Sequence, residues 1–242
     1  MPVWIKRRCL NMPSFVAASR KRTALVLGCT FLVCLLSLKG LTNATLFELS
    51  AQVMADTEAQ FGGTAVARLN RWQRLINRNQ DASDWQKLHL VNQFANREVA
   101  FASDQEHWGA VDYWATPLES LQTSKGDCED YAILKYFTLR AMGVPEEKLR
   151  LMYVRALELN EPHMVLIYTE KPGQYPLVLD NLINEILPAN KRPDLKPVYS
   201  FNAQGLWLAR AQGLGKKVEN SAGVAQFEQL LARIEPLTPL AN

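Results

Sequence analysis

Hydrophobic side chains in the first half of the chain recur at intervals of three and four residues, which is the spacing of one face of an α-helix. Within residues 47–79 this spacing joins Val66, Leu69, Trp72, Leu75 and Ile76. A second amphipathic segment is expected to begin at Asp84 as its N-cap and to continue through Trp85, Leu88, Val91, Phe94 and Ala95. Residues 101–125 show no such spacing, so we expect them to be irregular.

A third helix is predicted over residues 127–142, because Gly143 and Pro145 directly after it are residues that commonly end helices. Beyond it the pattern changes to short apolar runs separated by turn residues, which indicates β-strands. These runs cover residues 150–157, 163–169, 177–180 and 205–209, and a last helix is expected at about 222–234. Helices followed by antiparallel strands predict an α+β fold rather than a doubly wound parallel sheet.

The first 44 residues carry a pattern of another kind. Basic residues at positions 20–22 precede an apolar run at 24–38, which is the order of charge and hydrophobicity in a secretory signal. The run is shorter than the roughly twenty residues of a typical membrane-spanning helix, so we expect export to the periplasm with cleavage near 42–44. The alternative is an uncleaved signal-anchor that tethers the protein to the inner membrane through residues 24–38. The predicted organisation is therefore a signal segment at 1–44 and one domain at 45–242.

The charge of the chain separates along the same boundary. The total of 27 basic and 24 acidic residues gives a net charge of +3, which taken alone suggests an acidic partner such as nucleic acid. Seven of the basic residues lie in the first forty positions, however, and no acidic residue accompanies them. The rest of the chain has 20 basic and 24 acidic residues, a net charge of −4. A nucleic-acid partner is therefore not expected.

The cysteines divide in the same way. Three of the four lie in or before the apolar run, which leaves Cys128 alone in the predicted domain, without a partner for a disulfide. Cys128 lies in the sequence GDCEDYA at the start of the helix predicted over residues 127–142. The backbone N–H groups and the positive dipole end of a helix favour a thiolate at such a position.

Two further residues complete a candidate catalytic set. His163 begins one predicted strand and Asp180 ends the next, so neighbouring antiparallel strands can bring their side chains together. A carboxylate that orients an imidazole, which in turn activates a thiol, is the arrangement of a nucleophilic triad. The order of Cys128 on a helix, then His163 and Asp180 on strands, therefore predicts a Cys-His-Asp triad.

Three acidic residues surround this cysteine in the sequence, namely Asp127, Glu129 and Asp130. Nearby negative charge disfavours a thiolate, so these acids work against a nucleophilic cysteine unless a cation offsets them. Carboxylates at the junction of a loop and a helix are hard oxygen ligands of the kind that Ca²⁺ prefers. We therefore expect a bound Ca²⁺. The alternative is that the acids only complement the positive end of the helix.

The three motifs GDCEDYA, NEPHMVLI and LVLDNL, in this order, resemble those of the bacterial transglutaminase-like cysteine proteinases of the LapG type, and the resemblance covers about residues 45–235. It implies a papain- or transglutaminase-like fold, with a helical N-terminal part and the nucleophile helix packed on an antiparallel sheet. It also implies Cys128 as the nucleophile, His163 as the general base and acid, and Asp180 as the orienting acid. The same resemblance implies Ca²⁺ held at Asp127 and Glu129, with Asp130 as a less certain ligand.

The resemblance further implies a periplasmic endopeptidase that cleaves the N-terminal region of a large cell-surface adhesin and so promotes biofilm dispersal. Control by an inner-membrane receptor that senses cyclic di-GMP is part of the same implication. Two other functions remain open: a transglutaminase or deamidase that attacks glutamine side chains with the same triad, and a non-catalytic module that binds a membrane receptor. The N–H of Cys128 is one expected oxyanion-hole donor, and Trp114, Gln122 or a nearby group is the candidate for the second.

Overall fold

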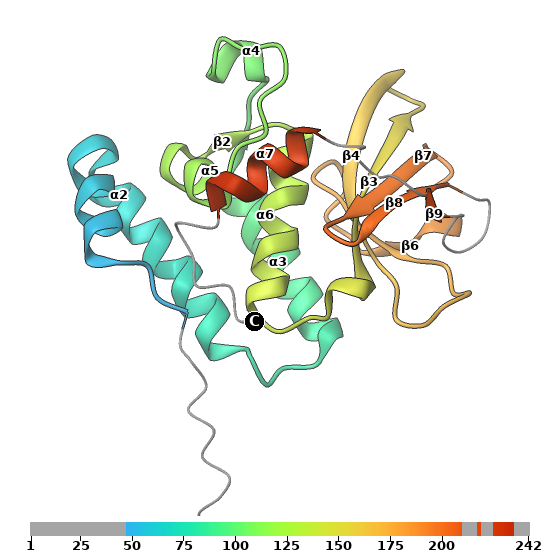
Figure 1. Cartoon of the computed structure of the whole chain (residues 1–242), viewed down its shortest axis with the longest axis horizontal. Coiled ribbons are helices and arrows are strands. Elements are labelled where there is room, and N and C mark those ends of the chain that lie inside the picture. Colours follow the sequence, from blue (N-terminus) through green and yellow to red (C-terminus); the bar gives the residue numbers. More distant parts are fainter. Residues whose placement is uncertain (1–46, 210–216, 219–224, 235–242) are drawn as a thin grey trace, which may run out of the picture. The chain divides into compact units, whose positions relative to one another are not determined.

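The computed structural model describes residues 47–209, 217–218 and 225–234, so the predicted signal segment at 1–44 lies outside the described residues. The described residues belong to one compact unit, Leu46–Asn242. Every helix within them is too short or too polar to cross a membrane. Figure 1 shows helices in the first half of this unit and a sheet in the second, which confirms the expected α+β class.

Two long helices open the described part of the chain. Helix α2 (Ala51–Arg78) bends at Gly62, whose φ of 77° lies in the left-handed region that glycine tolerates. Helix α3 (Asp84–Glu98) is capped by Ser83 and not by Asp84 as expected. The reason is a capping box, in which the Ser83 hydroxyl accepts from the N–H of Gln86 and the Gln86 side chain accepts from the N–H of Ser83.

The expectation that residues 101–125 are irregular is wrong. The stretch contains helices α4 (Asp104–His107) and α5 (Pro117–Thr123), and strands β1 (Ala100–Phe101) and β2 (Lys125–Gly126) pair in parallel at its ends. Both helices begin with capping boxes, but elements of two to seven residues are too short for a hydrophobic period to become visible. The β1–β2 pair is important because it brings residues near 102 beside the chain that leads into the next helix.

The second half forms a sheet of antiparallel strands in the order β6-β5-β4-β3-β7-β8-β9. Its strands are β3 (Leu149–Ala156), β4 (Glu161–Tyr168), β5 (Leu177–Leu179), β6 (Leu187–Pro188), β7 (Leu195–Asn202), β8 (Gly205–Leu208) and β9 (Lys217–Val218). Strand β7 was not expected, because Pro197 lies within it and proline argues against an inner strand. The register between β3 and β7 shifts at this proline, so a β-bulge accommodates it. Helix α7 (Ala225–Ile234) follows the sheet.

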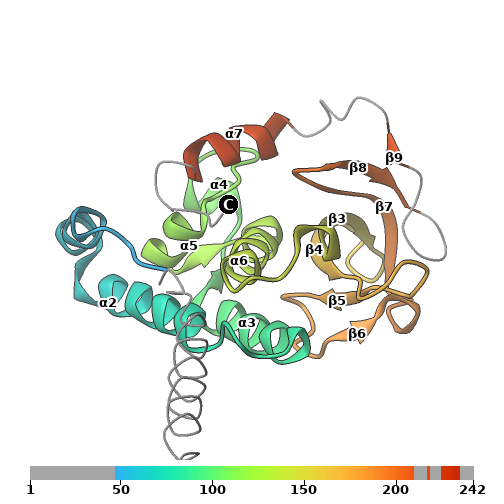
Figure 2. The same ribbon diagram turned by 60° about the horizontal axis from the view of Figure 1, so that its bottom comes forward.

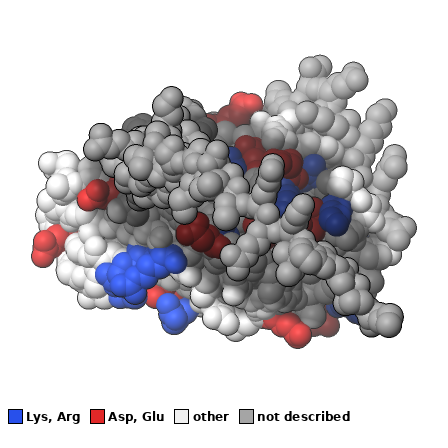
Figure 3. All heavy atoms as spheres, turned by 90° about the horizontal axis from the view of Figure 1, so that it is seen from below, with Lys and Arg blue, Asp and Glu red and all other residues white. Residues whose placement is uncertain are grey.

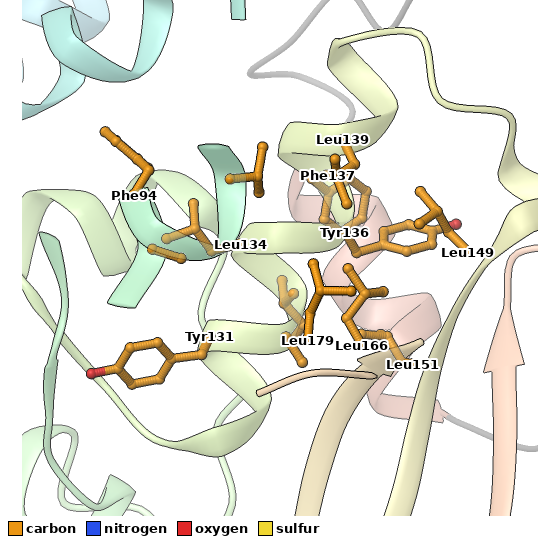
Figure 4. Close-up of a cluster of buried hydrophobic side chains, with 14 of the residues drawn as sticks. Phe94, Tyr131, Leu134, Tyr136, Phe137, Leu139, Leu149, Leu151, Leu166 and Leu179 are labelled. Atoms are coloured by element: carbon orange, nitrogen blue, oxygen red, sulfur yellow. The ribbon is translucent and has the colours of Figure 1, made fainter. Parts of the chain in front are cut away.

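Helix α6 (Cys128–Ala141) lies between the other helices and the sheet (Figures 1 and 2). Figure 4 shows Leu134 and Phe137 of α6 in one buried cluster with Leu151, Leu166 and Leu179 of the sheet. The opposite face of the sheet carries a smaller apolar cluster. Because the apolar contacts hold α6 against β3 and β4, the first residue of α6 is fixed close to the beginning of β4.

Charged side chains connect the helices. Glu98 at the end of α3 accepts from Arg71 of α2 at 2.6 Å and from its neighbour Arg97 at 3.2 Å. Arg68 lies within 3.8 Å of the same carboxylate. On the face of the molecule drawn in Figure 3, basic side chains gather in one cluster, while acidic and basic groups are interspersed elsewhere.

Candidate active site

Cys128 is the first residue of α6, and the residues before it are held by tight local packing. A Cβ atom at Gly126 would lie 2.7 Å from the Cβ and Oδ2 atoms of Asp130, so only glycine fits there. Asp130 is fully buried and accepts from the N–H of Ala115 at 2.7 Å and from that of Asp127 at 3.3 Å. The carboxylate of Asp130 therefore joins the loop before α5 to the start of α6.

The structure brings His163 and Asp180 together, as their positions on neighbouring strands led us to expect. The Nε2 atom of His163 lies 2.8 Å from Oδ1 of Asp180, and both side chains are buried. The backbone of Met164, the residue after His163, lies close enough to the Cys128 thiol to favour the thiolate, although burial and Glu129 have larger opposing effects on its pKa. Since Asp180 occupies Nε2, the other ring nitrogen, Nδ1, is the one left to exchange a proton with the thiol.

The charge around the thiol differs from the expectation that the helix start lowers its pKa. Burial, followed by the negative charge of Glu129, raises the pKa of the Cys128 thiol well above its usual range. The thiol donates a hydrogen bond to Oε2 of Glu129 at 2.9 Å. Burial and the Glu129 charge also raise the pKa of Asp127 to about 9, and burial raises that of Asp130. At the start of α6, burial and the neighbouring carboxylates therefore affect the pKa of the thiol more than the helix dipole does.

The acids around Cys128 offer a site for a cation. Oxygen atoms of Asp104, Asp127 and Asp130 lie within 4.8 Å of one another, and those of Asp104, Asp112 and Glu129 form a second such group. One carboxylate oxygen of Asp104 and one of Asp127 are buried without a hydrogen-bond partner among the described residues. Buried carboxylates of this kind fit the hard oxygen ligand set of Ca²⁺.

Asp104 and Asp112 were not expected at this site. Both lie in the stretch interpreted as irregular, and the pairing of β1 with β2 brings that stretch to the start of α6. Oδ2 of Asp104 accepts from the N–H of Tyr113 at 2.5 Å, which folds residues 104–113 back on themselves. The acidic residues in this stretch could have indicated further cation ligands, but no spacing in the sequence connects them to Glu129.

Two buried basic side chains, Arg192 and Lys135, interact with Asp180, the first by a direct contact and the second through its charge. Burial by itself would raise the pKa of Asp180, but hydrogen bonds and charge from His163, together with Arg192, lower it to about 2. Burial lowers the pKa of Lys135 to about 7, while the charge of Asp180 acts in the opposite direction. No motif of the sequence pointed to either cation.

The two side chains considered for the oxyanion hole have other partners. The amide of Gln122 donates to the hydroxyl of Thr57 in α2 at 2.7 Å. The ring of Trp114 stacks on Phe201 with 5.8 Å between the centroids. Neither contact decides the second donor, and the N–H of Cys128 at the start of α6 stays the predicted first one.

The site thus consists of a thiol at a helix start, an imidazole–carboxylate pair on a sheet and a cluster of acids, which defines the class of cysteine proteinases with a papain-like arrangement. The family model of the bacterial transglutaminase-like cysteine proteinases, BTLCP, matches residues 68–202, and the chain belongs to this family. Its fold is accordingly the transglutaminase-like variant of the papain fold.

Solved structures of LapG from Legionella pneumophila are similar to the chain over most of its length. The calcium-bound structure is 39% identical, covers 76% of this chain and 99% of the LapG chain, and has a TM-score of 0.65. The EGTA-treated structure is also 39% identical over 76% of this chain and 96% of its own, with a TM-score of 0.66. No curated protein matches the chain.

Proposed function

We propose that the protein is a calcium-dependent cysteine endopeptidase in which Cys128 is the nucleophile, His163 the general base and acid, and Asp180 the orienting acid. The observation that carries the proposal is the 2.8 Å contact between the buried side chains of His163 and Asp180, with the backbone of Met164, next to His163, close enough to act on the thiol of Cys128. A buried imidazole–carboxylate pair next to a cysteine is suited to nucleophilic catalysis.

The proposed reaction is acyl transfer in two stages. Nδ1 of His163 removes the thiol proton, and the sulfur of Cys128 attacks the peptide carbonyl while the Cys128 N–H stabilises the oxyanion. His163 then returns the proton to the leaving amine, which yields a thioester. In the second stage His163 activates water to hydrolyse the thioester, and Asp180 holds the imidazole in its tautomer throughout.

Calcium would be held by Asp127 and Glu129, with Asp104 and Asp112 as further oxygen donors and Asp130 close to them. A bound Ca²⁺ supplies positive charge, which offsets the carboxylates that raise the pKa of the thiol. The calcium-bound and EGTA-treated structures of Legionella LapG support this part of the proposal. The two oxygens of Asp130 each already accept a backbone N–H, so its role is chiefly to shape the site.

The substrate and control of the enzyme follow from the likeness to LapG-type proteinases. We infer that the protein acts in the periplasm, where it cleaves the N-terminal region of a large cell-surface adhesin and promotes biofilm dispersal. An inner-membrane receptor for cyclic di-GMP is the inferred regulator. The basic and apolar pattern of residues 1–44 supports export, with a membrane tether through residues 24–38 as the alternative to cleavage.

The test incubates purified protein with an N-terminal adhesin fragment, with Ca²⁺ and then with a calcium chelator, and sizes the products by mass spectrometry. We expect chain cleavage by the wild type with Ca²⁺ only, and no cleavage by Cys128→Ala. A mass change in an uncut fragment indicates a deamidase or transglutaminase instead. A Cys128→Ala variant that still releases adhesin from cells indicates a non-catalytic, receptor-binding role.

A further inference from the structure

Arg192 is a buried cation in direct contact with the carboxylate of Asp180. It follows the 3-10 helix η2 (Ala189–Lys191), and its side chain is only 1% exposed. Nη2 of Arg192 donates to Oδ2 of Asp180 at 2.6 Å, whereas Oδ1 of Asp180 faces His163 at 2.8 Å. The two oxygens of the carboxylate are therefore divided between the guanidinium group and the imidazole.

A second carboxylate holds the guanidinium group itself. Nε and Nη2 of Arg192 donate to Oδ1 and Oδ2 of Asp194 at 2.9 and 2.7 Å, a fork-like geometry that fixes a planar guanidinium group. The side chain of Asp194 is 24% exposed, so it is in contact with solvent, unlike Arg192. The contacts form one line from His163 through Asp180 and Arg192 to Asp194.

The backbone of Asp180 is held without help from Arg192. The carbonyl oxygen of Asp180 accepts from the amide of Asn96 at 2.9 Å, and the N–H of Leu182 donates to Oδ1 at 3.1 Å. Oδ2 has only the guanidinium group of Arg192 as a hydrogen-bond partner among the described residues. Loss of Arg192 therefore leaves Oδ2 without this partner and weakens the hold on the orientation of the carboxylate, while the loop that carries Asp180 keeps its own contacts.

We propose that Arg192 is a positioning residue, which holds the Asp180 carboxylate so that Asp180 orients His163 for proton transfer; this inference rests on the proposed function of the same site. The charge of Arg192 also offsets part of the charge that Asp180 presents to the imidazole. The other charged groups that face Asp180 are His163 and the buried Lys135, and Asp194 lies behind Arg192.

The first measurement compares kcat and KM of Arg192→Ala with those of Arg192→Lys and of the exposed neighbour Lys191→Ala. Misplacement of a catalytic group by about 1 Å costs on the order of 100-fold in rate. We expect kcat of Arg192→Ala to fall to that extent with KM nearly unchanged, and Arg192→Lys to recover part of the loss.

A second measurement uses the cavity of about 250 Å³ that Arg192 lines together with Val154, Val165 and Val178. Removing the Arg192 side chain joins its space to this cavity, so millimolar guanidinium ion has a route to the carboxylate of Asp180. We expect guanidinium to restore part of the kcat of Arg192→Ala and to leave Lys191→Ala and the wild type unchanged. Circular dichroism confirms that each variant is folded.

A third measurement does not depend on any substrate. In a Cys128→Ala background, the NMR signal of the His163 Nε2 proton that faces Asp180 should move in Arg192→Ala and stay in place in Lys191→Ala. A folded Arg192→Ala variant with wild-type kcat, or with reduced kcat but no change of this NMR signal and no rescue, overturns the inference. Failure of the wild type to cleave the adhesin fragment instead overturns the proposed function, and the NMR signal of the His163 Nε2 proton then decides the role of Arg192 separately.

Discussion

The buried lysine of α6 makes the stability of the protein depend on pH in a predictable direction. The side chain of Lys135 is fully buried, and its Nζ has no hydrogen-bond partner among the described residues. The ring of Tyr131 lies 5.9 Å from it. Burial lowers the pKa of Lys135 from 10.5 to about 7, although the charge of Asp180 favours the protonated form.

Unfolding returns this lysine to water, where its pKa is that of a free side chain. Between about pH 7 and pH 10 the unfolded state therefore binds more protons than the folded state, and the free energy of unfolding rises with pH. The pKa difference means that Lys135 lowers the free energy of unfolding by about 4 kcal/mol at pH 7 and by about 2 kcal/mol at pH 9. A neutral side chain of similar length removes this penalty.

Lys135→Met should thus be more stable than the wild type at pH 7, and its advantage should shrink by about 2 kcal/mol between pH 7 and pH 9. Urea unfolding at pH 7, 8 and 9 measures the difference directly. Lys171→Met serves as the control, because Lys171 is exposed and its ammonium group is in water in both states. A difference between Lys135→Met and the wild type that stays constant over this pH range would refute the reasoning.

Three further predictions concern local features of the site and its supports. Asp104→Asn should abolish the rise in Tm that Ca²⁺ gives to the wild type, as seen by differential scanning fluorimetry, whereas the exposed Glu106→Gln should keep it. Gly126→Ala should lower the free energy of unfolding by about 1–3 kcal/mol, because its Cβ meets Asp130 at 2.7 Å; unchanged urea unfolding contradicts this. Ser83→Ala should cost about 1 kcal/mol by the same measurement through loss of the α3 cap, with Ser83→Asp as a restoring variant.

The elements that the sequence predicts well are those whose signal is local. The helix that carries Cys128, the strand that carries His163 and the strand that ends directly before Asp180 have apolar patterns with clear ends, and the structure contains all three. Strand β7 was not predicted because Pro197 interrupts its apolar pattern. The bulge opposite β3 allows the sheet to contain this proline. A bulge depends on the partner strand, so a pattern along one segment does not reveal it.

The parts of the site that were not predicted depend on contacts between distant segments. Arg192 lies twelve positions after Asp180 and shares no motif with it, yet the two side chains meet at 2.6 Å. Lys135 occupies a core position of α6 at which the pattern predicts an apolar residue. Charged residues of this kind become recognisable only when burial and partners are known, because their chemistry is set by desolvation and not by neighbours in the sequence.

The geometry of the candidate calcium site depends on the short strand pair of β1 and β2. Strands β1 and β2 have two residues each, but their hydrogen bonds, including that from Ala102 to Gly126 at 3.0 Å, place Asp104 beside Asp127. A cation that binds the folded state alone stabilises it in proportion to RT ln(1 + [Ca²⁺]/Kd). Calcium binding and the closure of this pair therefore stabilise each other. Because the same junction leads directly into Cys128, a metal held there would order the start of α6 and offset the negative charge around the thiol.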